Sequence, residues 1–251
     1  EEAIGKHIAG LVDDGACLQL GIGGIPDAVL LFLHEKNDLG IHTEMFSEGV
    51  VDLYNEGVVT NARKNLHRDK MVATFLMGTR RLYDFVDDNP MVNMFPVNYT
   101  NDPFVIGQID NVVSINSALQ VDLMGQVVAD TMGPMQYTGI GGQVDFVRGA
   151  ARSKGGKAII ALPATAKKGA ISRVVAKVGD GAAVTTVRAD VDYVVTEFGV
   201  AHLKGKSLHE RARALIAIAH PDFRDRIVEE CTALRGDGWF CGTRSKALWG
   251  E

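Results

Sequence analysis

The hydrophobic positions in the first ninety residues alternate between a helical and a strand-like spacing. Residues 1–15 carry apolar side chains three and four positions apart, which predicts an amphipathic helix. Residues 16–40 combine an apolar run, a glycine-rich turn and a second helical pattern that we expect to end at Gly40. The apolar run at 70–78 predicts a strand, and the spacing after it predicts a short helix that ends before Pro90.

Strand patterns dominate the middle of the chain. Residues 104–130 are rich in Val and Ile and contain turn signals, which predicts several short strands. Residues 157–165 predict a further buried strand. A Gly-Asp-Gly turn at 179–181 lies between two β-branched runs and predicts a hairpin, and residues 191–199 predict the next strand.

Two helices are predicted near the C-terminal end of the sequence. Ser207 and Glu210 stand at the spacing of a capping box, and the apolar periodicity after them ends near Pro221. A second helical pattern begins there. Because we find no internal repeat and no low-complexity linker, the sequence predicts a single α/β domain over residues 1–251 with a mixed sheet.

Composition and charge exclude several classes of protein. Of the 251 residues, 46% are hydrophobic and 23% are charged, which is an ordinary globular mixture. The formal net charge of −5 provides no basic surface for nucleic acid. No apolar run approaches the roughly 18 residues that a membrane span needs, so we expect no membrane segment.

The cysteines argue against covalent or metal cross-links. There are three, widely spaced and without a CxxC pair, which indicates neither a disulfide framework nor a zinc site. We therefore expect no metal. A reducing compartment, the cytosol or an organelle matrix, fits this usage.

Two glycine clusters are candidates for binding an anion. The first, GIGGIP at 21–26, lies between a predicted strand and a predicted helix, where backbone N–H groups can face an anion. It lacks the third glycine of the dinucleotide fingerprint, because Pro26 stands there. The second, GIGGQVDF at 139–146, precedes a basic stretch at 148–157 that suits phosphate. A tight strand–helix turn and a solvated basic loop are the alternative interpretations.

Glu44 lies in GIHTEMFSEGV, between a predicted strand end and a glycine turn. Most glutamates are solvated and do no chemistry, so it needs further support. His42 could orient this carboxylate, but packing explains a histidine there better. Glu48 and Glu197 are rival nucleophiles on chemistry alone. The sequence has no nucleophile elbow, no P-loop and no HExxH motif.

Six stretches, in this order, resemble the acetyl-CoA hydrolase/transferase branch of the family I CoA-transferases. They are GIGGIPDAV, GIHTEMFSEGV, SINSALQVDLMGQV, GIGGQVDF, SKGGKAIIALPAT and VDYVVTEFGVAHLKGKSL. The resemblance runs from the first predicted helix to about residue 225, and the tail at 236–251 is not diagnostic. Within this branch the stretches look like 4-hydroxybutyrate and butyrate CoA-transferases.

The resemblance implies a fold and a reaction. Members carry two related α/β domains of the NagB/RpiA/CoA-transferase type, with a mixed sheet and flanking helices. This chain matches only the C-terminal one, so we expect it to begin in mid-protein, without the N-terminal half. The resemblance implies that Glu44 attacks an acyl-CoA thioester and is then converted to a glutamyl-CoA thioester. CoA would pass in ping-pong fashion between acids such as acetate, butyrate and 4-hydroxybutyrate.

The resemblance also assigns residues around Glu44. Oxyanion and CoA contacts fall to the two glycine loops and to the asparagine of YTNDP, namely Ile22, Gly23, Gly24, Asn101, Gly141, Gly142 and Gln143. Apart from the resemblance, Lys204 and Lys206 in AHLKGKSL stand just ahead of the capped helix, where a CoA phosphate could be met. For Lys204 a solvated loop before a helix is the alternative interpretation. Glu48 is explained as a turn residue, and Glu197 as a residue that holds structure or lines the CoA channel.

The expected partners follow from the same resemblance. They are acyl-CoA, short carboxylic acids, the N-terminal CoA-transferase domain of the same enzyme and a second subunit in a homodimer. Coenzyme A enters as a substrate, and no permanently bound cofactor is expected. The expected location is the cytoplasm, or the mitochondrial matrix in a eukaryote.

Three other functions stay open from the sequence. In an acyl-CoA hydrolase, water rather than a second acid would resolve the glutamyl thioester. A half enzyme could also serve only as a CoA-binding subunit without catalysis. A sugar-phosphate isomerase of the same superfold is the third alternative, because a fold does not determine a function.

Overall fold

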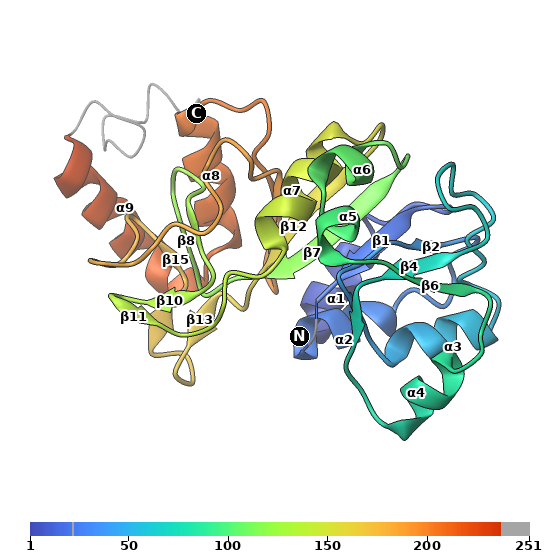
Figure 1. Cartoon of the computed structure of the whole chain (residues 1–251). Coiled ribbons are helices and arrows are strands. Elements are labelled where there is room, and N and C mark those ends of the chain that lie inside the picture. The colour runs from blue at the N-terminus through green and yellow to red at the C-terminus, as the bar shows by residue number, and fades with distance from the viewer. Residues whose placement is uncertain (22, 237–251) are drawn as a thin grey trace. The chain divides into compact units, whose positions relative to one another are not determined.

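The computed structural model describes residues 1–21 and 23–236, and these residues group into two compact units (Figure 1). Unit 1 comprises Glu1–Ser117 and Gly141–Ile160. Unit 2 comprises Ala118–Ile140 and the described residues from Ala161 onward. This division concerns compactness only. The prediction that residues 1–251 form a single family domain stays a prediction.

Unit 1 alternates short strands with helices, as the first part of the sequence predicts. Its helices are α1 (Glu2–Ala9), α2 (Gly24–Leu30), α3 (Gly49–Asn55), α4 (Arg80–Val86), α5 (Val97–Thr100), α6 (Pro103–Gly107) and α7 (Gln143–Arg152). Its strands are β1 (Cys17–Leu20), β2 (Gly40–Ile41), β3 (Met45–Phe46), β4 (Met71–Ala73), β5 (Phe75–Leu76), β6 (Val92–Met94), β7 (Val112–Ser117) and β12 (Lys157–Ala161).

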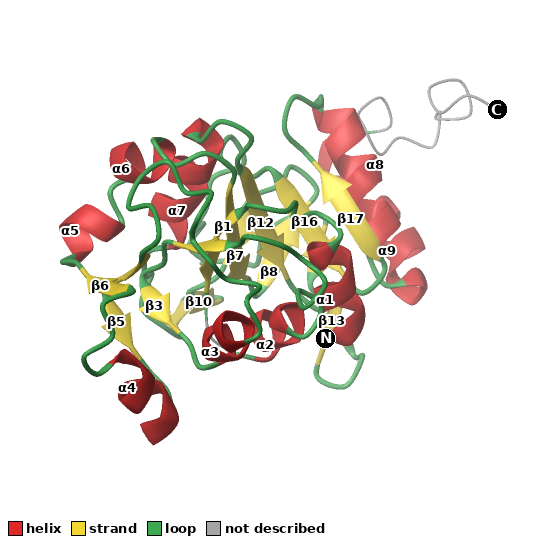
Figure 2. Ribbon diagram, turned by 90° about the vertical axis from the view of Figure 1, so that its right-hand side faces the viewer, coloured by secondary structure: helices red, strands yellow, loops and turns green. Residues whose placement is uncertain are grey.

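The main sheet of unit 1 has the strand order β12-β7-β1-β2. β1 pairs in parallel with both neighbours, so that Cys17 stands opposite Gly40 on one side and Val112 on the other. Helices α1 and α2 pack together against one face, and α6 and α7 cover the other (Figure 2). All four residues of β1 are buried, as expected for a parallel strand that is covered on both faces.

Two small parallel pairs, β4 with β6 and β3 with β5, extend unit 1 beyond β2. A single bridge between His42 and Val72 connects the end of β2 to β4. The chain between β2 and β3 therefore passes from the main sheet, alongside β4, to the β3–β5 pair, and Glu44 lies in this connection.

Unit 2 is built mainly from short strands and two longer helices. Its strands are β8 (Gln120–Asp122), β9 (Val127–Val128), β10 (Thr131–Met132), β11 (Met135–Gln136), β13 (Thr165–Ala166), β14 (Ile171–Ser172), β15 (Val174–Val175), β16 (Tyr193–Thr196) and β17 (Gly199–His202), and its helices are α8 (Leu208–Ile218) and α9 (Pro221–Arg235). β8 pairs antiparallel with β9 and parallel with β15, whereas β16 and β17 form an antiparallel hairpin. The predicted mixed α/β class is confirmed.

Three helix predictions differ from the structure. The helix expected over residues 1–15 ends at Ala9. The helix expected to end at Gly40 ends at Leu30, and Gly40 instead opens β2 opposite Cys17. The region expected to be strands from residue 104 begins as α6, because the Asp102 side chain accepts a hydrogen bond from the Phe104 N–H (2.8 Å) and a proline follows at the first helical position. The predicted capping box of α8 is confirmed.

The predicted hairpin around the Gly-Asp-Gly turn is wrong. Val174 and Val175, before the turn, pair with β8, and Thr186, after it, bridges to Val127 next to β8. Both β-branched runs thus bind the β8–β9 hairpin and not each other. Among the described residues, no helix combines the length and apolar character that crossing a bilayer requires.

Candidate active site

Glu44 lies where the chain leaves the main sheet of unit 1. The His42 N–H still donates to a carbonyl of β1 (3.1 Å), whereas the Thr43 N–H donates to a carbonyl of β4 (3.0 Å). The Glu44 carbonyl accepts from the N–H groups of Thr74 and Phe75 (2.9 and 3.1 Å). The backbone is therefore held by hydrogen bonds one peptide group before Glu44 and directly after it.

The loop 61–70 holds the strand that leads into Glu44. The Ile41 N–H donates to Asn61 Oδ1 (2.9 Å), and the Ile41 carbonyl accepts from Lys64 Nζ (2.8 Å). Lys64 is buried, and burial lowers the pKa of its ammonium group. Two side chains thus satisfy both peptide groups of the last β2 residue at the edge of the sheet.

The half-buried Glu44 carboxylate lies at the start of α7. Its Oε2 accepts a hydrogen bond from the Gly142 N–H (3.1 Å). Gly142 is the N-cap of this ten-residue helix. The N-terminus of a helix has unpaired N–H groups and a partial positive charge, both of which stabilise an anion. The structure therefore brings Glu44 and the second glycine loop together.

Asn101 reaches the same point of the loop. A Cβ atom built on Gly142 would lie 2.5 Å from Asn101 Nδ2 and 2.7 Å from Glu44 Oε2. Both side chains therefore fill the space that any larger residue at 142 would need. Gly141 differs, because its φ of 58° is left-handed, a conformation that favours glycine.

Several buried polar atoms in the segments around Glu44 have no hydrogen-bond partner among the described protein atoms. They are His42 Nδ1, Thr74 Oγ1, Thr100 Oγ1 and Asn101 Oδ1. Most buried polar groups in folded proteins are paired. Unused donors and acceptors in the segments that adjoin a carboxylate are typical of a site that binds something polar.

His42 contacts Thr100 and not Glu44. Its Nε2 lies 2.9 Å from the Thr100 carbonyl oxygen, which can only accept, so the ring proton is on Nε2. Burial lowers the pKa of His42 to about 4, and the ring is neutral at pH 7. Sequence reasoning missed Thr100, because it acts through a backbone carbonyl that no residue pattern marks.

Asp145 lies in the first turn of α7, close enough to Glu44 for their charges to interact. Burial raises the pKa of Asp145, and the charge of Glu44 raises it further. The nearby Arg148 opposes both effects. Two carboxylates therefore lie near the start of α7, and Glu44 is the one that accepts the hydrogen bond from the Gly142 N–H.

The rival glutamates both have structural contacts. Glu48 accepts from the N–H and hydroxyl of Thr79 (3.3 and 2.5 Å), at the residue that begins α4. In unit 2, Glu197 accepts from the Ala164 N–H (2.8 Å). These contacts agree with the interpretation that Glu48 serves a turn and that Glu197 holds structure.

The remaining predicted site residues are less informative. Gly23, with a φ of 110°, is the N-cap of α2, Gly24 is the first residue of that helix, and Ile22 lies outside the described residues. Gln143 is buried as the first residue of α7. Lys204 is exposed in the turn between β17 and α8 of unit 2. No hydrogen bond joins Gly23 or Gly24 to Glu44 in the described part of the chain.

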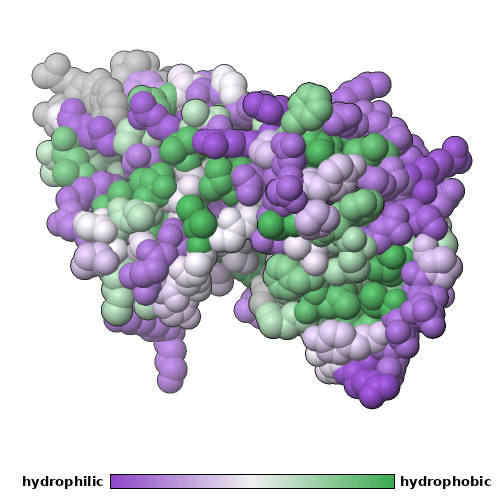
Figure 3. All heavy atoms as spheres, in the orientation of Figure 1, coloured by the Kyte–Doolittle hydropathy of each residue, from purple (hydrophilic) through white to green (hydrophobic). Residues whose placement is uncertain are grey.

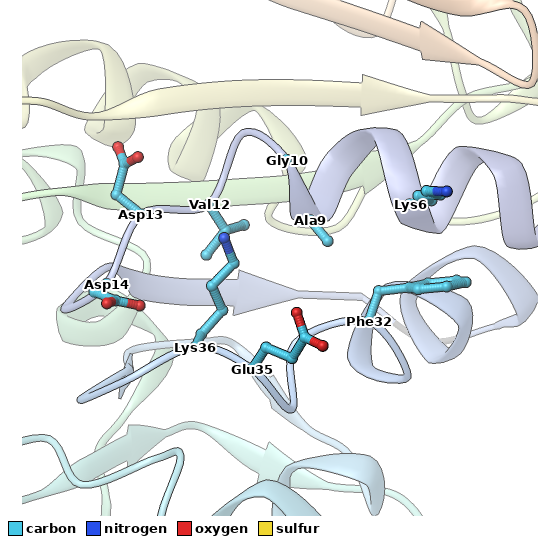
Figure 4. A pocket seen from close by; sticks show the side chains of 9 residues that line it. All are labelled: Lys6, Ala9, Gly10, Val12, Asp13, Asp14, Phe32, Glu35 and Lys36. Atoms are coloured by element: carbon cyan, nitrogen blue, oxygen red, sulfur yellow. The ribbon is translucent and has the colours of Figure 1, made fainter.

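A separate hollow in unit 1 lies between the end of α1 and the segment after α2 (Figure 4). It is lined by Lys6, Ala9, Gly10, Val12, Asp13, Asp14, Phe32, Glu35 and Lys36. None of the predicted site residues lines it. Within residues 1–21 and 23–236, no three His, Cys, Asp or Glu side chains form a group that could hold a metal ion.

Comparison with known proteins identifies the family. Residues 78–231 match the acetyl-CoA hydrolase/transferase C-terminal domain. The chain belongs to this family. The resemblance inferred from the sequence is therefore confirmed.

Individual relatives agree with this assignment. The 4-hydroxybutyrate coenzyme A transferase of Clostridium kluyveri is 62% identical over 230 residues, which are 92% of this chain and 54% of the relative. The butyryl-CoA:acetate CoA-transferase of Anaerostipes caccae is 47% identical over 92% of this chain and 53% of its own length. The crystal structure of RipA from Yersinia pestis superimposes with a TM-score of 0.88 at 50% identity, over 92% of this chain and 52% of that one. The chain thus spans about half the length of the curated relatives it matches.

Proposed function

We propose that this chain is the C-terminal half of a CoA-transferase that moves coenzyme A between a short acyl-CoA and a carboxylic acid, with Glu44 as nucleophile. The observation that carries the proposal is the half-buried Glu44 carboxylate, held by the Gly142 N–H at the start of α7. Membership of the family and relatives that are named CoA-transferases support it.

The proposed reaction has two halves. The Glu44 carboxylate attacks the acyl-CoA carbonyl, and the C–S bond breaks to give a mixed anhydride and the CoA thiolate. The thiolate then attacks the glutamyl carbonyl, which forms the glutamyl-CoA thioester and releases the first acid as its carboxylate. A second carboxylate repeats these steps in reverse and leaves as the new acyl-CoA. The free energy of the thioester is retained through the mixed anhydride and the glutamyl-CoA thioester, and the proposed cycle uses no resident cofactor and no metal.

Each attack develops a negative charge on a carbonyl oxygen. The Gly142 N–H is already aimed at the reacting carboxylate, and the dipole of α7 adds to its field. A donor placed in this way contributes about 3 kcal/mol to the stability of the tetrahedral oxyanion that forms on the glutamyl carbonyl when the thiolate attacks it. The unpartnered Asn101 Oδ1 and the nearby Nδ2 supply an acceptor and a donor for an amide or carbonyl of the substrate.

The other predicted contacts remain part of the proposal. Backbone groups of the first glycine loop, at 22–24, and of Gly141 and Gln143 would hold the acyl group or the pantetheine arm. Lys204 would meet a phosphate of CoA. The exposed position of Lys204 is compatible with this role and equally with a solvated turn.

The N-terminal half of such an enzyme is the first proposed partner. Apolar side chains reach the surface of unit 1 (Figure 3), among them Phe75, Met77, Met94 and Val97. The Phe75 N–H binds the Glu44 carbonyl, so this exposed apolar surface begins beside the nucleophile. We propose that the N-terminal domain covers it and completes the acyl pocket, and that the whole enzyme is a homodimer of the cytoplasm or, in a eukaryote, of the mitochondrial matrix.

Acyl exchange tests the proposed function. The whole enzyme, with its N-terminal domain, is mixed with acetyl-CoA and either butyrate or 4-hydroxybutyrate, and the acyl-CoA products are separated by chromatography. A transferase forms the new acyl-CoA and free acetate without net release of CoA. Release of CoA with no new acyl-CoA would indicate a hydrolase, and CoA binding without either reaction would indicate a binding subunit.

A further inference from the structure

Two segments of unit 1 carry the side chains that meet at Gly142. The first runs from β2 to Glu44, and the second is the short helix α5 with Asn101 at its end. The buried hydrogen bond from His42 Nε2–H to the Thr100 carbonyl (2.9 Å) joins these two segments directly. His42 lies two residues before Glu44, and Thr100 directly precedes Asn101.

We propose that His42 is a positioning residue, which fixes Asn101 against Glu44 and Gly142 through its hydrogen bond to the Thr100 carbonyl. The Thr100 carbonyl and the Asn101 N–H belong to one peptide group. A movement of this peptide therefore displaces the Asn101 side chain. The inference rests on the proposed function of Glu44 and deepens it.

The local structure gives α5 few other means of holding Asn101. α5 has four residues and no side-chain cap, and a helix of one turn has little stability of its own. Its second tether is the Tyr99 hydroxyl, 2.7 Å from His67 Nε2. That bond reaches an intermediate, partly exposed histidine, whereas His42 is 1% exposed and within the core.

The neutral state of His42 determines how it acts. A neutral ring has a single N–H, which the Thr100 carbonyl takes, and Nδ1 retains only a lone pair. His42 thus has no proton to donate to Glu44, and the structure shows no hydrogen bond between them. The hypothesis that His42 orients Glu44 directly is replaced by an effect through Asn101.

Three variants of the whole enzyme separate this role from packing. His42→Phe keeps a ring but loses the donor, and His42→Asn keeps an amide that is too short to reach Thr100. His42→Gln restores a donor at the distance of Nε2. The matched control is Ser153→Ala, which removes a buried hydrogen bond to the Ile109 carbonyl (2.6 Å) at the opposite end of α7.

We expect His42→Phe and His42→Asn to lower kcat about 10- to 100-fold, because small misplacements of positioned groups cost this much. KM for acyl-CoA should rise as well, because the displaced Asn101 is proposed to contact the substrate, and His42→Gln should reverse this rise together with the loss of kcat. His42→Gln should recover most of kcat, and Ser153→Ala should keep kcat while it lowers stability. Crystal structures of His42→Phe or His42→Asn should show Asn101 Nδ2 displaced from Gly142.

Two results would overturn the inference. One is a folded His42→Phe or His42→Asn enzyme whose kcat equals that of the wild type, and the other is a variant structure with Asn101 in its original place. If the wild type forms no thioester on Glu44, the proposed function fails, but the variant structures still decide whether His42 places Asn101. Should His42→Phe not fold, His42→Asn against His42→Gln supplies the same comparison.

Discussion

Glu44 in unit 1 and Glu197 in unit 2 have the same first contact but different surroundings. Each half-buried carboxylate accepts one backbone N–H, from Gly142 (3.1 Å) and from Ala164 (2.8 Å). Beside Glu197, the Thr196 hydroxyl both donates and accepts hydrogen bonds. Beside Glu44, buried polar atoms of neighbouring side chains have no partner among the described atoms. A hydrogen bond alone therefore does not distinguish the two carboxylates, whereas the unpaired polar atoms near Glu44 favour it as the member of a binding site.

The residues that donate these two hydrogen bonds also differ in their location. Gly142 begins the ten-residue helix α7, so the field of aligned peptide groups acts on Glu44. Ala164 lies in the connection between β12 and β13, where no helix contributes. In the proposed mechanism, the hydrogen bond to Glu44 stabilises developing charge, whereas the hydrogen bond to Glu197 connects two loops.

The largest expected difference comes from removing each carboxylate. Glu44→Gln keeps the size and the acceptor for Gly142 but cannot form the thioester, so we expect acyl exchange to fall at least about 10³-fold, as for other catalytic nucleophiles. Glu197→Gln should change kcat less than about threefold and act only on stability. Steady-state exchange rates of the whole enzyme measure both. Equal losses in the two variants would remove the distinction between the sites.

The next largest expected effect is on the pH dependence of stability, which should differ between the wild type and His42→Gln in acid. Burial lowers the pKa of His42 to about 4 from an ordinary value of 6.5, so the unfolded chain binds its proton at higher pH than the folded chain does. The stability that the neutral ring provides is complete above pH 6.5 and is lost as the pH falls toward 4, by on the order of 3 kcal/mol. Urea unfolding of the wild type and His42→Gln across this window isolates the contribution, because all other groups are shared. Parallel pH dependences would show that His42 is not buried in a neutral form.

Crowding at Gly142 gives a third way to sharpen the comparison. Its φ of −88° is accessible to alanine, but an added Cβ would lie 2.7 Å from Glu44 Oε2. We expect Gly142→Ala to lower kcat about 100-fold, comparable to the loss of an oxyanion donor. Gly139→Ala, in the same loop with no atom within 4 Å of the added group, should leave kcat unchanged. An inactive Gly139→Ala would instead indicate that the whole loop must move.

The smallest expected effect concerns Glu48, the nearest rival in sequence. Its carboxylate accepts from the Thr79 N–H and hydroxyl at the start of α4. Glu48→Gln should therefore lower the free energy of unfolding by about 0.5–1 kcal/mol, as the loss of one ordinary hydrogen bond does, with kcat unchanged. Thermal unfolding and the exchange assay measure the two quantities. A large loss of activity in a stable Glu48→Gln enzyme would transfer the nucleophile to Glu48.

Local signals in the sequence predict the fold where they act alone. The capping box at Ser207 and the apolar periodicity of α1 concern neighbouring residues, and both elements are confirmed. The helix that begins at Pro103 also has a local signal, an N-cap Asp followed by Pro. The strand prediction relied on the β-branched residues and overlooked it. The partners of Val174 and Thr186 depend on strands more than forty residues away, and no short pattern specifies such pairing.

The candidate site was also predictable only in part. The resemblance selected Glu44, Asn101 and Gly142 from distant stretches, and the structure places all three at one point. Their separation of up to 98 positions means that composition and spacing could not have joined them. The tie between His42 and Thr100 was not predictable, because its acceptor is a peptide carbonyl.

The location of the covalent CoA group tests the central claim most directly. The whole enzyme is mixed with acetyl-CoA, treated with borohydride to reduce a glutamyl thioester to an alcohol, digested with trypsin and sequenced by mass spectrometry. Glu44 and Glu48 share the peptide 37–63, so fragmentation must separate them, whereas Glu197 lies in the peptide 189–204. We predict reduction at Glu44 alone. Reduction at Glu48 or Glu197, or an unmodified Glu44 in an enzyme that still transfers CoA, would contradict the account.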